Sequence, residues 1–183
     1  MAYKNKTIRN PKTQTAITFL QTANDTGGQL LEMEHTYNGH STEPAPHYHP
    51  NQEEEFTVLS GELSVRIDGQ VRVLKQGERL HIPKNKIHSM WNNSAEKTVV
   101  NWKVQPAMDT ECFLETAAGL ANDGKTNGAG MPGLLQVALL ANRFSAVFRL
   151  SKPPFPIQRV LFGILMPVAY LAGYRPVYKK YLD

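Results

Sequence analysis

The chain has 183 residues, 41% hydrophobic and 20% charged, a composition typical of one folded domain with an elaboration. A single cysteine, Cys112, excludes an intrachain disulfide and fits a reducing compartment. The net charge of +4 does not by itself indicate a nucleic-acid partner, because the basic residues lack the interleaved aromatic clusters of a single-strand binder.

The first hundred residues contain short strand-like segments separated by turn residues, which is typical of an all-β sandwich or barrel. The first twenty residues lack the apolar run of a secretory signal, so we expect a cytoplasmic protein. Asp68-Gly69 is the clearest turn, because a type I′ hairpin turn requires positive φ at two successive residues. The expected strands are 15–22, 29–37, 55–60, 62–67, 71–74, 80–82 and 98–104.

Beyond residue 106 the pattern becomes helical. We expect helices over 110–121, 134–150 and 157–172, separated by a glycine-rich connection and a proline cluster. The most apolar run, 160–172, is shorter than the roughly 20 residues of a membrane-spanning helix, so no transmembrane span is expected.

Charge is unevenly distributed along the chain. Residues 124–183 contain eight basic residues and only one acidic residue, Asp183. The last two predicted helices are apolar around much of their circumference, so we expect them to dock on the barrel or on a second subunit. The alternative is peripheral membrane contact through an amphipathic anchor.

Three histidines and a carboxylate form a candidate metal site. Alternation along an extended strand places His47 and His49 on one face, and Glu54 follows closely enough to return to the same point. His88 must arrive from a distant strand. Imidazole and carboxylate ligands together suit one divalent transition metal, namely Fe, Mn, Ni, Cu or Zn.

These residues resemble the two motifs of the cupin superfamily. The first motif matches at His47, His49, Glu54 and Gly61. The second motif matches at Gly77, Pro83, His88 and Asn92. Ser41 and Asn85 replace the remaining motif glycines, and asparagine tolerates the left-handed conformation better than most residues.

The resemblance covers roughly residues 14–106 and implies a mainly β fold, an antiparallel double-stranded β-helix or jelly-roll barrel, which we expect to occupy residues 1–106. Residues 107–183 form a helical C-terminal extension outside the resemblance. The family also implies a metal at the centre of the barrel, held by His47, His49, Glu54 and His88, and a homodimer.

Strand parity predicts the walls of a substrate pocket beside the metal. Phe56 and Val58 share the face of Glu54, while Met90 and Asn92 share the inward direction of His88. The remaining histidines, including His35 and His81, are interpreted as structural or surface residues.

Three classes of function remain open for such a site. The first is a dioxygenase-type oxidoreductase acting on a small organic molecule, in which Glu54 also accepts a proton. The second is a metal-assisted isomerase or lyase of a small carbonyl or sugar. The third is a noncatalytic protein that binds a small ligand. The ligand set alone does not separate them.

Overall fold

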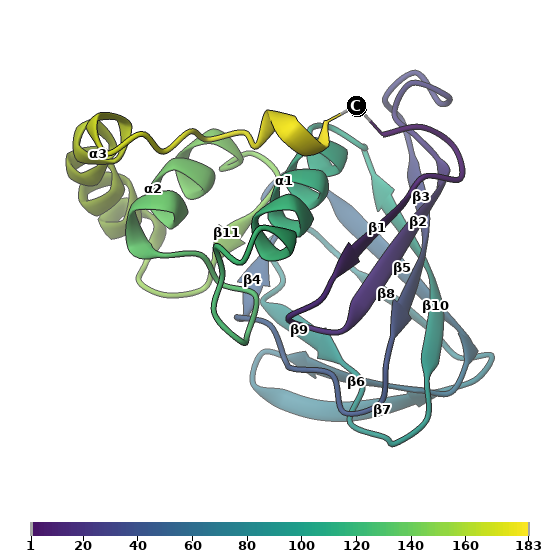
Figure 1. The fold of residues 1–183 in the computed structure, drawn as a ribbon. Coiled ribbons are helices and arrows are strands. Elements are labelled where there is room, and N and C mark those ends of the chain that lie inside the picture. The colour runs from purple at the N-terminus through teal and green to yellow at the C-terminus, as the bar shows by residue number, and fades with distance from the viewer. Residues whose placement is uncertain (1, 183) are drawn as a thin grey trace.

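The computed structural model describes residues 2–182 and folds their strands into two antiparallel sheets, with the helices following to one side (Figure 1). This confirms the predicted mainly β fold with a helical extension. Within these residues, one sheet has the order β1 (Thr7–Asn10), β2 (Thr15–Gln21), β3 (Leu31–Tyr37), β10 (Thr98–Gln105), β5 (Glu53–Ser60) and β8 (Arg79–Ile82). The other has the order β11 (Arg149–Leu150), β4 (His47–Tyr48), β9 (His88–Trp91), β6 (Glu62–Ile67) and β7 (Gln70–Lys75).

The apolar alternation of the strands fills the space between the sheets. Phe56 and Val58 from one sheet pack with Leu63 and Val65 from the other, and all four side chains are buried. Burying an aliphatic or aromatic side chain of this size contributes about 1.5–3 kcal/mol. This shared core holds the two sheets, and therefore β4, β5 and β9, in fixed relation.

The predicted hairpin turn is confirmed. Asp68 and Gly69 have φ values of 47° and 88°, and they join β6 to β7 in register. Strand β1 was not predicted, because Thr7–Asn10 carries mostly polar side chains and lacks a clear alternation of apolar and polar residues. Its pairing with β2 at the sheet edge makes it a strand.

Two of the three predicted helices agree closely with the structure, and one does not. Helix α1 (Thr110–Asn122) packs against β1 and against the short 3₁₀ helix η1 (Lys179–Tyr181), and α3 covers Phe155–Leu171. The prediction of one helix over 134–150 is wrong, because α2 (Leu134–Arg143) ends seven residues earlier.

The chain after α2 turns back to the barrel instead. Phe144 and Val147 are buried in a cluster with Leu120 and Leu140, and Arg149–Leu150 then pairs with β4 as strand β11. Pairing with an otherwise open strand edge satisfies backbone groups of β4. Tertiary contacts therefore override the helical pattern of this segment.

Helix α3 packs on α2 and lies at the end of the molecule remote from the barrel (Figure 1). Docking on the barrel is thus observed for α1, whereas within residues 2–182 the outer face of α3 stays uncovered. No helix in this described range is both long and apolar enough to cross a membrane.

Candidate metal centre

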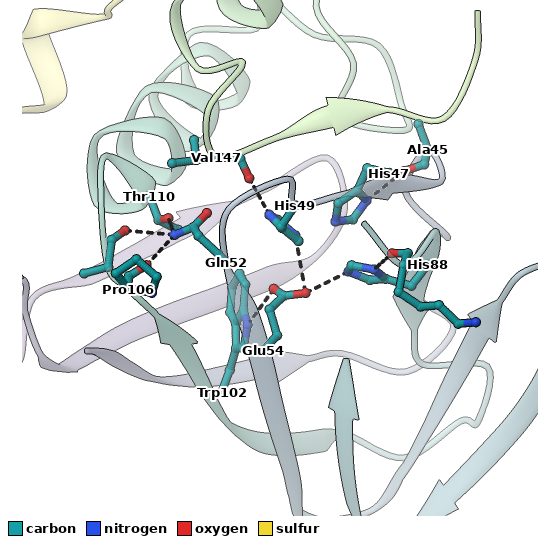
Figure 2. A network of polar contacts seen from close by, with 12 residues as sticks. Ala45, His47, His49, Gln52, Glu54, His88, Trp102, Pro106, Thr110 and Val147 are labelled. Carbon is teal, nitrogen blue, oxygen red and sulfur yellow. Dashed lines mark hydrogen bonds and ion pairs between the residues drawn. The ribbon is translucent and has the colours of Figure 1, made fainter. Parts of the chain in front are cut away.

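Four side chains, three from strands β4, β5 and β9 and one from the residue after β4, meet in a polar network (Figure 2). His47 on β4 lies directly opposite His88 on β9 in the strand register, and His49 follows β4. The ligand nitrogens of the three histidines lie within 4.8 Å of one another. Glu54 on β5 places Oε2 at 3.3 Å from Nε2 of His49 and 2.9 Å from Nε2 of His88. The structure therefore brings together all four sequence-predicted ligands.

The orientation of each imidazole is set by a backbone carbonyl. Nδ1 of His47 lies 3.1 Å from the carbonyl oxygen of Ala45, and Nδ1 of His88 lies 2.8 Å from that of Lys86. Nδ1 of His49 lies 2.5 Å from the carbonyl oxygen of Val147 (Figure 2). An Nδ1–H donated to a carbonyl leaves Nε2 as the ligand atom, as is usual for metal-bound histidine. This network assigns the tautomer that directs all three Nε2 atoms inward.

Val147 belongs to the C-terminal extension, so the extension completes the site. Its carbonyl holds His49, and the adjoining strand β11 pairs with β4, which carries His47. Ser151 adds a third link, because its N–H donates to the carbonyl of Pro46 at 3.0 Å. No feature of the sequence indicated this role, since a backbone carbonyl carries no residue signature.

The ionisable side chains of the cluster shift one another's pKa values. Burial alone would raise the pKa of Glu54, but the positive potential of His49 and a hydrogen bond with His88 outweigh burial and lower that pKa to about 2. Burial and the neighbouring imidazoles hold the pKa of His47 well below its usual value. For His88 the burial effect is outweighed by Glu54, so its pKa is raised. Metal binding needs an ionised carboxylate and neutral imidazoles, so the ionised Glu54 and neutral His47 suit it, and a bound metal would displace the proton that Glu54 favours on His88.

Two buried atoms at the centre are incompletely satisfied within residues 2–182: Nε2 of His49 has no hydrogen-bond partner, and Oε2 of Glu54 has only its ion-pair contacts with His88 and His49. Buried polar atoms without partners are costly, and they are uncommon in folded proteins. Both atoms point at the space shared by the three imidazoles, where a cation would satisfy them. The donor set and its geometry thus fit one divalent transition metal.

The second oxygen of Glu54 is held by Trp102, which sequence reasoning missed. The indole Nε1–H of Trp102 on β10 donates to Oε1 of Glu54 at 3.0 Å (Figure 2). Nearby, Nε2 of Gln52 donates to the carbonyl of Pro106 at 2.7 Å and to Oγ1 of Thr110 at 2.7 Å. These bonds fix the loop between His49 and Glu54 against the start of α1.

A cavity of about 250 Å³ opens beside His47, Glu54 and His88. Phe56 and Met90 line it, as the strand parity predicted. The C-terminal extension contributes two further lining residues, Phe113 and Phe148. Their rings stack on each other with centroids 4.8 Å apart. Phe148 also stacks on His47, with ring centroids 4.8 Å apart, and lines the cavity beside this candidate ligand.

The other two predicted pocket residues lie elsewhere. Val58, two residues after Phe56 on β5, packs in the core between the two sheets and does not line the cavity. The Asn92 side chain is fully buried outside the cavity lining, and its Nδ2 donates to the carbonyls of Glu96 in the following turn and of Asn38 just after β3. Strand β9 ends at Trp91, so the alternation that would point Asn92 inward no longer applies.

The departures from the motif glycines have local explanations. Asn85 has φ of 64°, the left-handed conformation expected of the glycine it replaces. Ser41 uses its Oγ to accept the backbone N–H of Asn92 at 2.8 Å. These substitutions leave the strand ends that carry the ligands in place.

His81 and His35 differ in their surroundings. His81 is exposed and lies 3.2 Å from Glu53, in agreement with its interpretation as a surface residue. His35 lines the cavity and stacks on Tyr37 and Trp102, but neither ring nitrogen has a hydrogen-bond partner within residues 2–182. Burial lowers the pKa of His35 to about 3, so its ring is neutral at physiological pH.

Comparison with known proteins agrees with this geometry. A family model for the cupin domain matches residues 33–102, which include all four candidate ligands. An uncharacterised protein of Aquifex aeolicus is 34% identical over 68 residues, covering 37% of this chain and 55% of the relative. An oxidoreductase of Arthrobotrys oligospora is 27% identical over 154 residues, covering 75% of this chain and 59% of the relative.

The chain therefore spans less than two thirds of the length of both relatives. Among solved structures, KdgF from a Halomonas species aligns with 53% of this chain and 83% of its own, at a TM-score of 0.46 and 16% identity.

Proposed function

Because the chain belongs to the cupin superfamily, we propose that it is a metal-dependent oxidoreductase of the dioxygenase type acting on a small, largely apolar organic molecule. The observation that carries this proposal is the convergence of His47, His49, Glu54 and His88 beside an apolar cavity. Four protein ligands leave coordination positions free for a substrate.

The metal would be held by the three Nε2 atoms and Oε2 of Glu54. When bound, iron, copper, nickel, manganese or zinc supplies a Lewis acid, and all of these except zinc also supply redox chemistry. The chain's own residues orient the ligands through the carbonyls of Ala45, Lys86 and Val147. Phe148, which stacks on His47, and Phe113, which stacks on Phe148, add apolar surface beside the ligands that would reduce access of water to a bound metal.

The nature of the cavity walls favours an apolar substrate over a sugar. Phe56, Met90, Trp102 and Phe148 provide aromatic and thioether surface next to the ligands. A sugar needs several hydrogen-bonding groups to replace its hydration, whereas most of the exposed cavity surface is apolar, with polar side chains such as Arg9, Asn10 and Thr42 among the lining residues. The name of the Arthrobotrys relative as an oxidoreductase points in the same direction.

Glu54 is proposed chiefly as a ligand. A carboxylate whose pKa lies near 2 is a weak base at neutral pH, so proton acceptance by Glu54 requires its release from the cluster. Trp102 opposes that release by holding Oε1. A proton-accepting role thus predicts faster turnover when this indole bond is removed, and a purely ligating role predicts slower turnover.

The experiment that tests the proposal combines metal analysis with oxygen uptake. Protein purified without chelator is analysed by emission spectrometry and assayed on flavonol-like and diketone substrates. We expect about one redox-active metal per chain and substrate-dependent oxygen consumption. Turnover without oxygen would instead identify an isomerase or lyase, and tight ligand retention without turnover a binding protein.

Matched variants separate the site from the surface. His49→Ala removes a candidate ligand and should lower bound metal well below one per chain. His81→Ala removes an exposed histidine outside the cavity and should leave metal content unchanged. Equal metal content in the two variants would overturn the assignment of the site.

A further inference from the structure

Helix α3 carries an apolar stripe that faces solvent. The stripe follows the three- and four-residue spacing of one helix face. Its members are between 40% and 90% exposed: Ile157, Val160, Leu161, Ile164, Val168 and Leu171. Scattered exposed apolar residues are ordinary, but a contiguous row of six along one helix marks an interaction surface.

The buried side of the same helix shows that its orientation is fixed. Phe162 and Ala169 are buried where α3 packs on α2. Nε2 of Gln158 donates to the carbonyl of Leu150 at 2.8 Å and to that of Pro153 at 2.6 Å. These contacts lie about a third of a turn from the stripe, so the stripe cannot rotate inward without breaking them.

Charge identifies the kind of partner. Residues 124–182 contain eight basic residues and no acidic residue. Arg159 lies within α3, and Lys152 and Arg175 flank its two ends, all three exposed. Among residues 2–182 no ion pair joins these three to a carboxylate, whereas Arg143 is paired with Asp109.

We propose that the outer face of α3 docks on an anionic lipid surface, with the apolar stripe in the headgroup and acyl boundary. An interfacial helix of this kind combines an apolar face with basic residues and lies in the plane of the membrane. A second copy of the chain is a poorer occupant. Pairing two α3 helices would place their basic residues near one another, and this region offers no carboxylate to neutralise them.

This inference is independent of the metal chemistry, since it uses none of the site residues. Its geometric consequence is that Gln158 links the membrane-facing helix to β11, the strand that pairs with β4. Docking would therefore orient the whole barrel relative to the lipid surface.

The test is co-sedimentation of the full chain with vesicles of phosphatidylcholine alone or mixed with phosphatidylserine. We expect binding to the mixed vesicles, weakened by salt, and about fivefold weaker binding for each basic residue removed, as in Lys152→Gln and Arg159→Gln. The double variant Val160→Glu/Ile164→Glu should abolish binding.

The matched control is Val71→Glu/Val73→Glu, which changes two similarly exposed valines on the edge strand β7. This control should bind vesicles like the unaltered chain, and circular dichroism should show that both double variants remain folded. Vesicle binding that is absent, or equal in the two double variants, overturns the proposal. So does sedimentation equilibrium showing a dimer that Val160→Glu/Ile164→Glu dissociates while vesicles are not bound.

Discussion

Replacing Glu54 by glutamine tests the candidate metal centre most directly. The substitution keeps the size of the side chain, and the amide oxygen can still accept the indole N–H of Trp102. It replaces the charged Oε2, which lies 2.9 Å from His88 and 3.3 Å from His49, by a neutral amide nitrogen. The change therefore removes one charge and one ligand atom and leaves the packing intact.

The expected loss of metal affinity follows from the ligand set. Altering a residue that only orients a ligand typically weakens metal binding by about 10–100-fold. Glu54 contributes the ligand atom itself and the only carboxylate within reach of the three imidazoles in residues 2–182. We therefore expect Glu54→Gln to weaken binding at least about 100-fold, or about 2.8 kcal/mol.

The metal-free protein should also lose stability, in a defined pH window. Glu54 has a lowered folded pKa, so its contribution is present above 4.5 and is lost as the pH falls toward 2. His88 has a raised folded pKa, so its contribution is present below 6.5 and is lost as the pH rises through the folded value. Their pair is worth most between these limits, where a charged hydrogen bond contributes about 1.5–3 kcal/mol.

Two measurements check the reasoning. Competition with a chromophoric chelator gives metal affinity, and urea unfolding with chelator present at pH 5.5 and pH 8 gives stability. Glu53→Gln is the control, because Glu53 is the adjacent carboxylate but lies on the exposed side beside His81. If Glu54→Gln and Glu53→Gln have the same metal affinity, or if the stability loss from Glu54→Gln is larger at pH 8 than at pH 5.5, the site is not organised as described.

Three further predictions concern two residues that line the cavity and two turn glycines of the barrel. Folded His35 resists protonation because it is buried, so the free energy of unfolding should fall as the pH drops from 6.5 to about 3. His35→Phe should reduce the slope of this fall by up to about 1.36 kcal/mol per pH unit, the value for one proton. Urea unfolding with chelator measures the slope, and an unchanged slope contradicts the burial argument. Phe148→Ala should cost about 1.5–4.5 kcal/mol in urea unfolding through the loss of its ring contacts with His47, His49 and Phe113, each worth about 0.5–1.5 kcal/mol. Metal content should stay near that of the unaltered chain; loss of metal would show that the ring also holds the histidine ligands in place. Gly61→Ala should destabilise the protein more than Gly77→Ala in thermal unfolding. Both glycines have positive φ, which costs an L-residue about 1–2 kcal/mol, but only a Cβ at Gly61 would meet a backbone oxygen, that of Lys97, at 2.6 Å. Equal losses of stability in the two variants would refute the steric part of this argument.

Local sequence rules determined the barrel and the identity of the candidate ligands. The Asp68-Gly69 turn and the alternating strands on either side depend on φ preferences and on burial of every second residue, which are properties of a few adjacent residues. The spacing of His47, His49 and Glu54 is likewise readable, since a short extended segment has little freedom in where it points its side chains.

Tertiary structure alone decided how the site is completed. The segment after Arg143 has a helical pattern, yet it forms β11 because pairing with β4 satisfies backbone groups that no local rule takes into account. The carbonyl of Val147 and the indole of Trp102 reach the ligands from 98 and 48 residues away along the chain. Contacts at such separation depend on how the sheets and the extension pack, so composition and spacing carry no trace of them.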